Sequence, residues 1–240
     1  MDETDESRIM MNPVPKTIYQ TWFTKSLPTG IQNSIDAMLS RNPNYAYELS
    51  DDVDMLSFIE KNYSQLVVDC FKSLTIGAAK ADFWRYLMLY KNGGVYLDVD
   101  SLITGKLDDL LLDDGCAVIS RENNFGLFVQ WCLVFPPNHP ILGICINNCI
   151  ENISRGNIKN VLELTGPMVY SKSIREFFND AAVYSKPDQE LNSMKDKTGV
   201  RFHSFDYKGF AEFFHPNKYE LYTIDNPHWS VEQKQMEAKQ

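Results

Sequence analysis

The chain has 240 residues, 44% of them hydrophobic and 12% aromatic, with only 12 Gly and 11 Pro. This composition excludes a disordered, collagen-like or low-complexity chain, and the length suits one large α/β domain. The 23 basic and 32 acidic residues give a formal charge of −9, so electrostatic attraction does not favour nucleic acid or anionic lipid as a partner.

The two ends of the chain differ from its middle. Residues 1–12 contain an acidic run and residues 231–240 are polar, so we expect exposed tails around a single domain at 13–230. The N-terminus is acidic where a secretory signal is basic and then apolar, and no apolar stretch reaches the roughly 20 residues that span a bilayer. The five cysteines form no C-x-x-C pair, which indicates reduced thiols. These features predict a cytoplasmic protein without stable membrane insertion.

The first third of the chain alternates strand and helix patterns. Residues 16–20 and 45–49 have strand patterns, and a helix is expected at 30–40 between them. Ser50-Asp51-Asp52 offers an N-cap and an acidic first turn for a helix that runs to about Asn62.

The most regular helical pattern lies at 76–91, where apolar residues recur at three- and four-residue spacing. Asn92-Gly93-Gly94 ends it, because glycine accepts the left-handed conformation common at a helix C-terminus. A short apolar strand at 95–97 then runs into Asp98-Val99-Asp100. Further along we expect strands at 116–120 and 127–135, helices at 140–153 and 167–178, and a surface loop at 183–199. This alternation predicts an α/β fold with a mixed, mostly parallel sheet between helices.

Two pairs of charged residues carry the chemistry. On a helix, Asp82 and Arg85 are three residues apart and project from one face, where a carboxylate and a guanidinium can grip hydroxyl groups. If Asp98 to Asp100 continues the strand, alternation puts both carboxylates on one side and Val99 on the other. The carboxylates then converge at the carboxyl end of a strand, where open α/β sheets place their ligands.

Two neighbouring carboxylates repel each other unless a proton or a divalent cation lies between them. Mg²⁺ or Mn²⁺ suits such oxygen ligands and keeps coordination positions for phosphate oxygens. An acidic protein can bind an anionic nucleotide in this way. A D-x-D triplet by itself is also typical of a solvated turn, but an apolar strand after Gly-Gly, with Asp82 and Arg85 upstream, favours a site.

These residues carry a resemblance to a known family. Asp82-x-x-Arg85 followed by Gly93-Gly94-Val95-Tyr96-Leu97-Asp98-Val99-Asp100 resembles the core signature of the DXD-containing glycosyltransferases of family 32, and also that of the glucosylating domains of large clostridial toxins. The segment from Pro15 to Trp22, together with Asn138-His139-Pro140 and Thr165-Gly166-Pro167, is similar to further landmarks of the family. The resemblance covers roughly residues 13–229. It implies a Rossmann-like GT-A fold, a nucleotide-sugar donor (a UDP- or GDP-sugar), a divalent metal and retention of anomeric configuration.

The resemblance also implies roles for individual residues. Trp22 would stack on the nucleotide base, and Asp82 with Arg85 would hold the donor sugar. Asp98 would contact the ribose or sugar and the metal, and Asp100 would ligate the metal directly. The donor-binding set further includes Gln20 and Gly94. The catalytic set is Asp82, Arg85, Asp98 and Asp100.

The chain departs from the family pattern at three points. Tyr19 and Ala81 replace a usual His and a frequent Ser, and the C-terminal His, gap and Ser-Trp pattern becomes His228-Trp229-Ser230. The resemblance therefore leaves two candidates for a further metal ligand, His228 and His215.

The expected reaction is transfer of the sugar to a glycan, lipid-linked or other hydroxyl acceptor, by front-face displacement since no nucleophile stands out. Such an activity in a chain without an anchor suits a bacterial or viral enzyme. One alternative is a phosphohydrolase of the haloacid-dehalogenase type, because Asp98-Val99-Asp100 resembles its first motif, although its later Gly-Asp motif is missing. Another is a catalytically silent nucleotide- or carbohydrate-binding module.

Overall fold

The computed structural model describes residues 12–111, 114–123, 126–212, 221–222, 228, 230–231 and 233–234. The strands are β1 (Thr17–Thr21), β2 (Ala46–Ser50), β3 (Gly94–Leu97), β4 (Leu102–Ile103), β5 (Ala117–Ile119), β6 (Cys132–Phe135), β7 (Val200–Phe202) and β8 (Ala211–Glu212). The helices are α1 (Thr29–Arg41), α2 (Asp52–Asn62), α3 (Gln65–Ser73), α4 (Gly77–Asn92), α5 (Leu107–Leu111), α6 (Pro140–Arg155), α7 (Val161–Leu164), α8 (Pro167–Phe178), α9 (Asp188–Ser193) and α10 (Lys195–Thr198), with 3₁₀ turns η1 (Val183–Ser185) and η2 (Phe205–Tyr207).

A six-stranded sheet forms the centre of the molecule, in the order β2-β1-β3-β6-β5-β7. β1 pairs in parallel with both β2 and β3, β5 pairs in parallel with β7, and only β6 runs antiparallel to its neighbours. β4 and β8 form a separate antiparallel pair. The mixed, mostly parallel α/β sheet expected from the sequence is confirmed.

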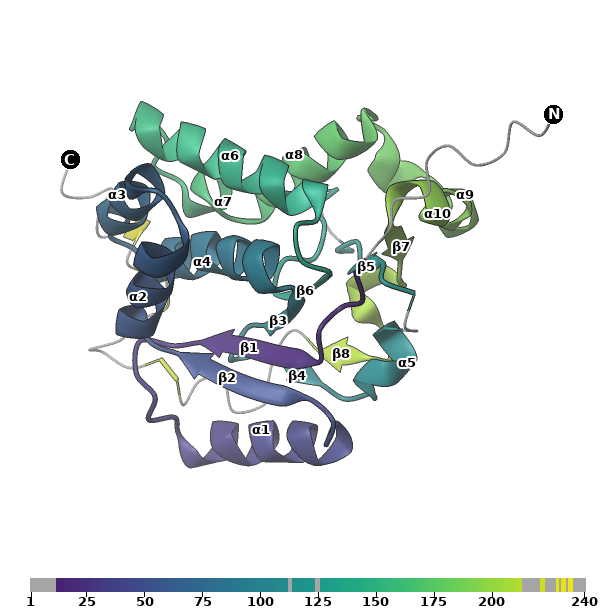
Figure 1. Cartoon of the computed structure of the whole chain (residues 1–240), viewed down its shortest axis with the longest axis horizontal. Coiled ribbons are helices and arrows are strands. Elements are labelled where there is room, and N and C mark those ends of the chain that lie inside the picture. The colour runs from purple at the N-terminus through teal and green to yellow at the C-terminus, as the bar shows by residue number, and fades with distance from the viewer. Residues whose placement is uncertain are drawn as a thin grey trace.

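Hydrophobic side chains fill both faces of this sheet, because successive strand residues point to opposite sides. Tyr19 and Tyr96 join one core with the large helices α4 and α6, whereas Ile18 and Val95 join a second core with α1 and α5. Figure 1 shows α1 below β1 and β2, with α4, α6 and α8 above them. The parallel strands thus end at one sheet edge between two helical layers.

Several predicted elements differ from the structure. Residues 183–199, expected as a surface loop, contain η1, α9 and α10, and the helix α3 has no counterpart in the prediction. The strand expected at 127–135 forms only at 132–135, because the preceding residues turn toward the end of β5.

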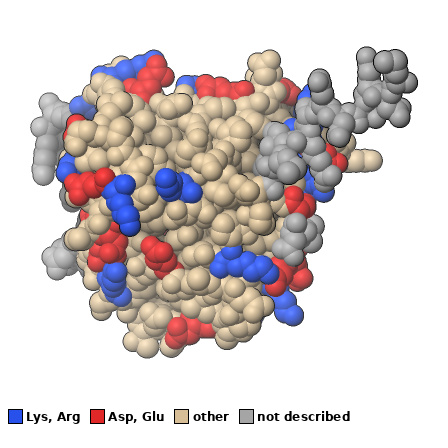
Figure 2. All heavy atoms as spheres, viewed as in Figure 1, with Lys and Arg blue, Asp and Glu red and all other residues tan. Residues whose placement is uncertain are grey.

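The five cysteines are free and buried, as expected for reduced thiols. In the described part of the chain, no helix is both long and apolar enough to cross a bilayer. On the face drawn in Figure 2, acidic and basic side chains are interspersed, and no continuous basic area is visible there.

Candidate active site

A cavity of about 280 Å³ opens where β1, β3 and β5 end and β6 begins. Of the predicted site residues, the structure brings six to its wall: Trp22, Asp82, Arg85, Asp98, Asp100 and His228. Open α/β sheets place their ligands at this carboxyl edge because the loops between strands and helices diverge there.

Helix α4 supplies Asp82 and Arg85 from adjacent turns of one face. The helix ends at Gly93, whose φ of 67° lets its backbone N–H bond the carbonyl of Leu89. Asp82 is 5% and Arg85 4% exposed, and the Arg85 Nη2 lies 3.2 Å from Asp82 Oδ1. The two residues predicted to bind a ligand therefore also form an ion pair with each other.

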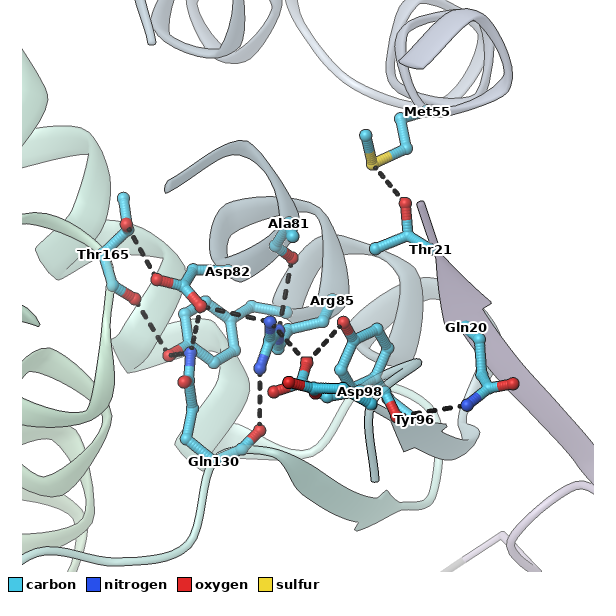
Figure 3. Close-up of polar contacts among 12 residues, drawn as sticks. Gln20, Thr21, Met55, Ala81, Asp82, Arg85, Tyr96, Asp98, Gln130 and Thr165 are labelled. Atoms are coloured by element: carbon cyan, nitrogen blue, oxygen red, sulfur yellow. Dashed lines mark hydrogen bonds and ion pairs between the residues drawn. The ribbon is translucent and has the colours of Figure 1, made fainter. Parts of the chain in front are cut away.

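Asp98 follows β3 and is fixed on several sides. Its backbone N–H donates to the Trp131 carbonyl at 2.8 Å, which extends the pairing of β3 with β6 by one residue. Its carboxylate Oδ1 lies 2.9 Å from Arg85 Nη2 and accepts from the Tyr96 hydroxyl at 2.9 Å. Arg85 thus joins the carboxylates of α4 and β3 in one cluster, drawn in Figure 3.

The D-x-D segment is a turn rather than the expected continuation of β3. The strand ends at Leu97, and the Ser101 N–H bonds back to the Asp98 carbonyl at 3.0 Å. The side chains nevertheless lie on the two sides that strand alternation predicted. Val99 is buried in the core, while Asp98 and Asp100 are half-buried and line the cavity. Asp100 Oδ2 accepts from the Tyr222 hydroxyl at 2.9 Å.

Gln130, Thr165 and Tyr86 complete the buried network. None of them was predicted from the sequence to have a role in the site, although Thr165 lies in one of the family landmarks. Gln130 Nε2 donates to Asp82 Oδ1 at 2.8 Å, and the Thr165 hydroxyl donates to Asp82 Oδ2 at 3.3 Å. Arg85 Nη1 donates to the Gln130 carbonyl at 3.0 Å. The landmark around Thr165 is the one signal present, whereas the patterns around Gln130 and Tyr86 do not distinguish them from ordinary core positions.

Burial controls the ionisation of this cluster. Desolvation raises the pKa of Asp82 to about 6, although the Arg85 charge and the Gln130 hydrogen bond oppose the rise. Desolvation also raises the pKa of the Asp98 carboxyl, again against the Arg85 charge. A third cavity residue, Glu122, has its pKa raised to about 7 by burial and by the nearby Asp206.

Trp22 and Gln20 lie at the end of β1 in different surroundings. Trp22 lines the cavity half-buried, with its ring edge-on to Tyr222 at a centroid distance of 5.8 Å. Gln20 is 1% exposed and does not line the cavity; its Nε2 donates to the Asp98 carbonyl at 3.1 Å. The structure therefore places Gln20 behind Asp98 as a support, not on the ligand side.

Gly94, a member of the predicted donor-binding set, does not line the cavity. It lies at the start of β3, away from the cavity edge, and has a φ of 113°. A Cβ there would lie 2.9 Å from both the Thr17 carbonyl and the Tyr19 ring. Glycine is required at this position by the backbone and by close packing with β1.

His228 lines the cavity, but its ring has other partners. Its Nδ1 lies 2.8 Å from the Ser230 hydroxyl, and its ring packs edge-on against Tyr222. Within the described ranges, no three His, Cys, Asp or Glu side chains lie close enough together to form a metal site by themselves. The rival candidate His215 lies outside the described residues.

The oxygen donors present suit a hard divalent cation. Asp98 and Asp100 offer carboxylate oxygens on one cavity wall, and Mg²⁺-type sites commonly use one or two carboxylates, completed by water and substrate phosphates. A protein donor set of two carboxylates therefore fits Mg²⁺ or Mn²⁺ bound together with a diphosphate.

Sequence comparison relates the part of the chain that carries both charged pairs to a group of glycosyltransferases. Residues 28–116, which include both charged pairs, match the family described as "Glycosyltransferase sugar-binding region containing DXD motif". This match covers less than half of the chain but includes the whole D-x-D segment, and the GT-A arrangement of the fold is shared by its structural neighbours.

Its curated relatives include several mannosyltransferases. The chain is 26% identical over 84% of its length to the initiation-specific alpha-1,6-mannosyltransferase of Candida albicans, of which the match covers 61%. It is 28% identical over 71% of its length to inositol phosphoceramide mannosyltransferase 2 of Schizosaccharomyces pombe, covering 50% of that protein. The chain spans about half to two-thirds of the length of three curated relatives that it matches.

Solved structures support the same fold. The PaToxG glycosyltransferase superposes with a TM-score of 0.58 at 20% identity, covering 78% of this chain and 76% of that one. The UDP-bound glycosyltransferase domain of the YGT toxin superposes with a TM-score of 0.53 at 10% identity, covering 87% of this chain and 82% of that one.

Proposed function

We propose that the protein transfers a sugar from a UDP- or GDP-sugar to a hydroxyl acceptor with the help of Mg²⁺ or Mn²⁺. One observation carries the proposal: Asp82 and Arg85 from α4 meet Asp98 and Asp100 from the end of β3 around a single cavity. The relatives' names make a mannosyl donor the first to test, and a glycan or a lipid headgroup is the matching acceptor class.

The charge of the cavity supports a role for a cation. Among the described residues that line the cavity, Arg85 supplies the one guanidinium. The acidic side chains there number five: Asp52, Asp82, Asp98, Asp100 and Glu122. A nucleoside diphosphate would be repelled by this excess of carboxylates. A divalent ion would reverse the local sign of charge and stabilise the negative charge that develops on the leaving diphosphate.

We assign the protein's own groups as follows. Asp100 and Asp98 would hold the ion, since both present carboxylate oxygens to the cavity. Trp22 offers a flat apolar surface for the nucleotide base. Asp82, with Arg85, would orient the sugar so that the acceptor hydroxyl approaches the anomeric carbon in a reactive geometry.

Retention of configuration by front-face displacement is part of the proposal. In this step the acceptor oxygen bonds to the anomeric carbon on the face from which the diphosphate departs. The bond from that carbon to the diphosphate oxygen breaks, and the proton of the acceptor hydroxyl passes to the departing diphosphate. The buried network fixes Asp82 and Arg85 before the ligand arrives, so little reorganisation is needed at the moment of reaction.

The rival functions have less support. The phosphohydrolase alternative needs a further Gly-Asp metal motif that the sequence lacks, and the family match is to glycosyltransferases. A silent binding module would bind nucleotide with metal and never release the sugar. The next experiment separates it from an enzyme.

The test combines binding and turnover. We expect UDP or GDP with Mn²⁺ to raise the melting temperature, because a ligand at about 100 times its Kd stabilises the folded state by about 2.7 kcal/mol. A panel of UDP- and GDP-sugars with Mn²⁺ should give metal-dependent release of nucleoside diphosphate.

Asp100→Asn should abolish both effects while the protein stays folded, whereas Asp109→Asn, on the exposed face of α5, should change neither. Full turnover in Asp100→Asn would contradict the assignment. Metal-dependent binding without turnover, with any donor or acceptor offered, would identify a silent module.

A further inference from the structure

Gln130 lies on the wall of the cavity just before β6 and beside both charged pairs. Its side chain and backbone are 6% exposed in total. The antiparallel strand β6 starts at the sheet edge where β3 ends, and this brings Gln130 against the α4 face. Figure 3 shows Gln130 next to Asp82 and Arg85.

The hydrogen bonds fix the orientation of the Gln130 amide. The Tyr86 hydroxyl has one proton, which it donates to the Thr165 carbonyl at 3.0 Å, so it accepts from the Gln130 side chain at 2.8 Å. The second contact of the same Gln130 atom, with Asp82 Oδ1 at 2.8 Å, also requires a donor. Both protons of Nε2 are therefore used.

This assignment leaves Gln130 Oε1 with no protein partner among the described residues, although the residue is more than nine-tenths buried and lines the cavity. Oε1 is not among the fully enclosed side-chain atoms that lack a hydrogen bond, so it is accessible from the cavity. A ligand that donates a hydrogen bond to Oε1 can therefore reach it without displacing a protein partner.

Asp82 beside it is also an acceptor whose capacity is nearly filled. Its Oδ1 faces the Gln130 amide and Arg85 Nη2, and its Oδ2 accepts from the Thr165 hydroxyl. A carboxylate has about four acceptor positions, so about one remains for a ligand. This part of the cavity therefore offers acceptors, and it suits a ligand that brings donors.

We infer that Gln130 Oε1 and Asp82 together select a neutral donor sugar with free hydroxyl groups at the position they contact, against deoxy sugars and uronic acids. This inference rests on the proposed function and deepens it. A deoxy sugar would leave Oε1 unpaired, and a uronate would bring a carboxylate toward Asp82 and Asp98. Sites built to bind a hydroxyl reject analogues without it by up to about 10⁴–10⁵-fold.

The test starts with the wild-type protein and Mn²⁺. Release of nucleoside diphosphate is compared for GDP-mannose, UDP-glucose, UDP-galactose and UDP-glucuronate. The best donor is then replaced by its monodeoxy analogues. We expect one deoxy position to lower kcat/KM by at least about 100-fold, and the uronate to be a poorer donor than the hexose. Effects below tenfold at every position, or preference for the uronate, would overturn the inference.

Gln130→Met then links this selectivity to the residue. It keeps the side-chain length and removes the amide, so discrimination against the sensitive deoxy donor should fall below about tenfold while the Kd for the nucleoside diphosphate with Mn²⁺ is unchanged. Asn148→Leu is the matched control, because Asn148 is also a buried amide that donates twice, to Ser173 and Glu176, outside the cavity. It should retain full discrimination.

If Gln130→Met does not fold, Gln130→Asn tests the same loss of discrimination. Its side chain keeps the amide but is one methylene shorter, so the amide oxygen no longer reaches the position of Oε1. Retained discrimination in either variant would overturn the role of Gln130. Failure of the wild type to bind or turn over any donor is a different result, because it contradicts the proposed function itself.

Discussion

Arg85 connects the two parts of the site at the scale of single residues. Its guanidinium contacts the carboxylates of Asp82 and Asp98 and the Gln130 carbonyl, and it lies 4.3 Å from the centre of the Tyr96 ring. The fork geometry of arginine makes these simultaneous contacts possible, whereas an ammonium group is a single point of charge. The attraction of Asp98 and the other nearby groups raises the Arg85 pKa despite the opposing effect of burial.

Arg85→Lys should therefore destabilise the protein by about 3 kcal/mol, because it breaks part of a buried charge network. Urea unfolding followed by circular dichroism measures the change. Arg155→Lys is the matched control: Arg155 pairs with Glu151 on the surface, both more than half exposed, and this change should cost less than about 0.5 kcal/mol. A loss below 1 kcal/mol for Arg85→Lys would show that the network adds little stability.

At the scale of elements, the neighbouring helices α2 and α3 begin in different ways. α2 starts with a full capping box: the Asp51 carboxylate accepts from the N–H groups of Val53 and Asp54 at 3.0 Å, and Asp54 accepts from the Asp51 N–H at 3.2 Å. The N-cap of α3, Ser64, makes no side-chain hydrogen bond to its helix. The position of α2, which supplies Asp52 and Met55 to the cavity wall, thus depends on a local sequence signal.

Asp51→Ala should destabilise the protein by about 1 kcal/mol, because two backbone donors lose their acceptor. Ser64→Ala should change the free energy of unfolding by only a few tenths of a kcal/mol, since no cap bond is lost. Thermal unfolding of both variants checks the difference. Equal effects would mean that the capping box of α2 contributes nothing measurable.

At the scale of the whole molecule, buried ionisable groups couple folding to pH. His139 caps α6 and packs between the rings of Phe135 and Phe177. Burial lowers its pKa from 6.5 to about 4. Between these pH values the unfolded chain therefore binds a proton at His139 and the folded chain does not. Stability therefore falls as pH decreases from 6.5 to 4. Asp82 and Glu122, whose pKa values are raised, act with the opposite sign: their contribution is lost as pH rises through about 6 and 7.

His139→Asn isolates the histidine contribution, because asparagine can cap the helix but does not titrate. Wild type should lose about 3 kcal/mol more than this variant between pH 7 and pH 4, since each pKa unit corresponds to about 1.36 kcal/mol. Urea unfolding at several pH values measures the two slopes. Parallel slopes would show that His139 is protonated in the folded protein.

Local patterns in the sequence are sufficient for much of the fold. The periodicity of 76–91 predicts α4, Asn92-Gly93 predicts its end, and the alternation around Val95 predicts β3, because each signal acts within a few residues. α3 and the helices within 183–199 escape prediction since they are short, at four to nine residues, and gain their stability by packing against the rest of the chain.

The sequence by itself determined the fold class and the two charged pairs of the site, since residue types and spacing act locally. Only the tertiary structure decided that Arg85 joins both pairs, that Gln130 and Thr165 hold Asp82, and that Gln20 and Gly94 lie away from the cavity. Apart from the Asp82–Arg85 pair within α4, the contacts with Asp98, Gln130 and Thr165 link residues 13 to 83 positions apart. The pairing of strands and the packing of α4 on the sheet bring them together, and no short pattern in the chain encodes that approach.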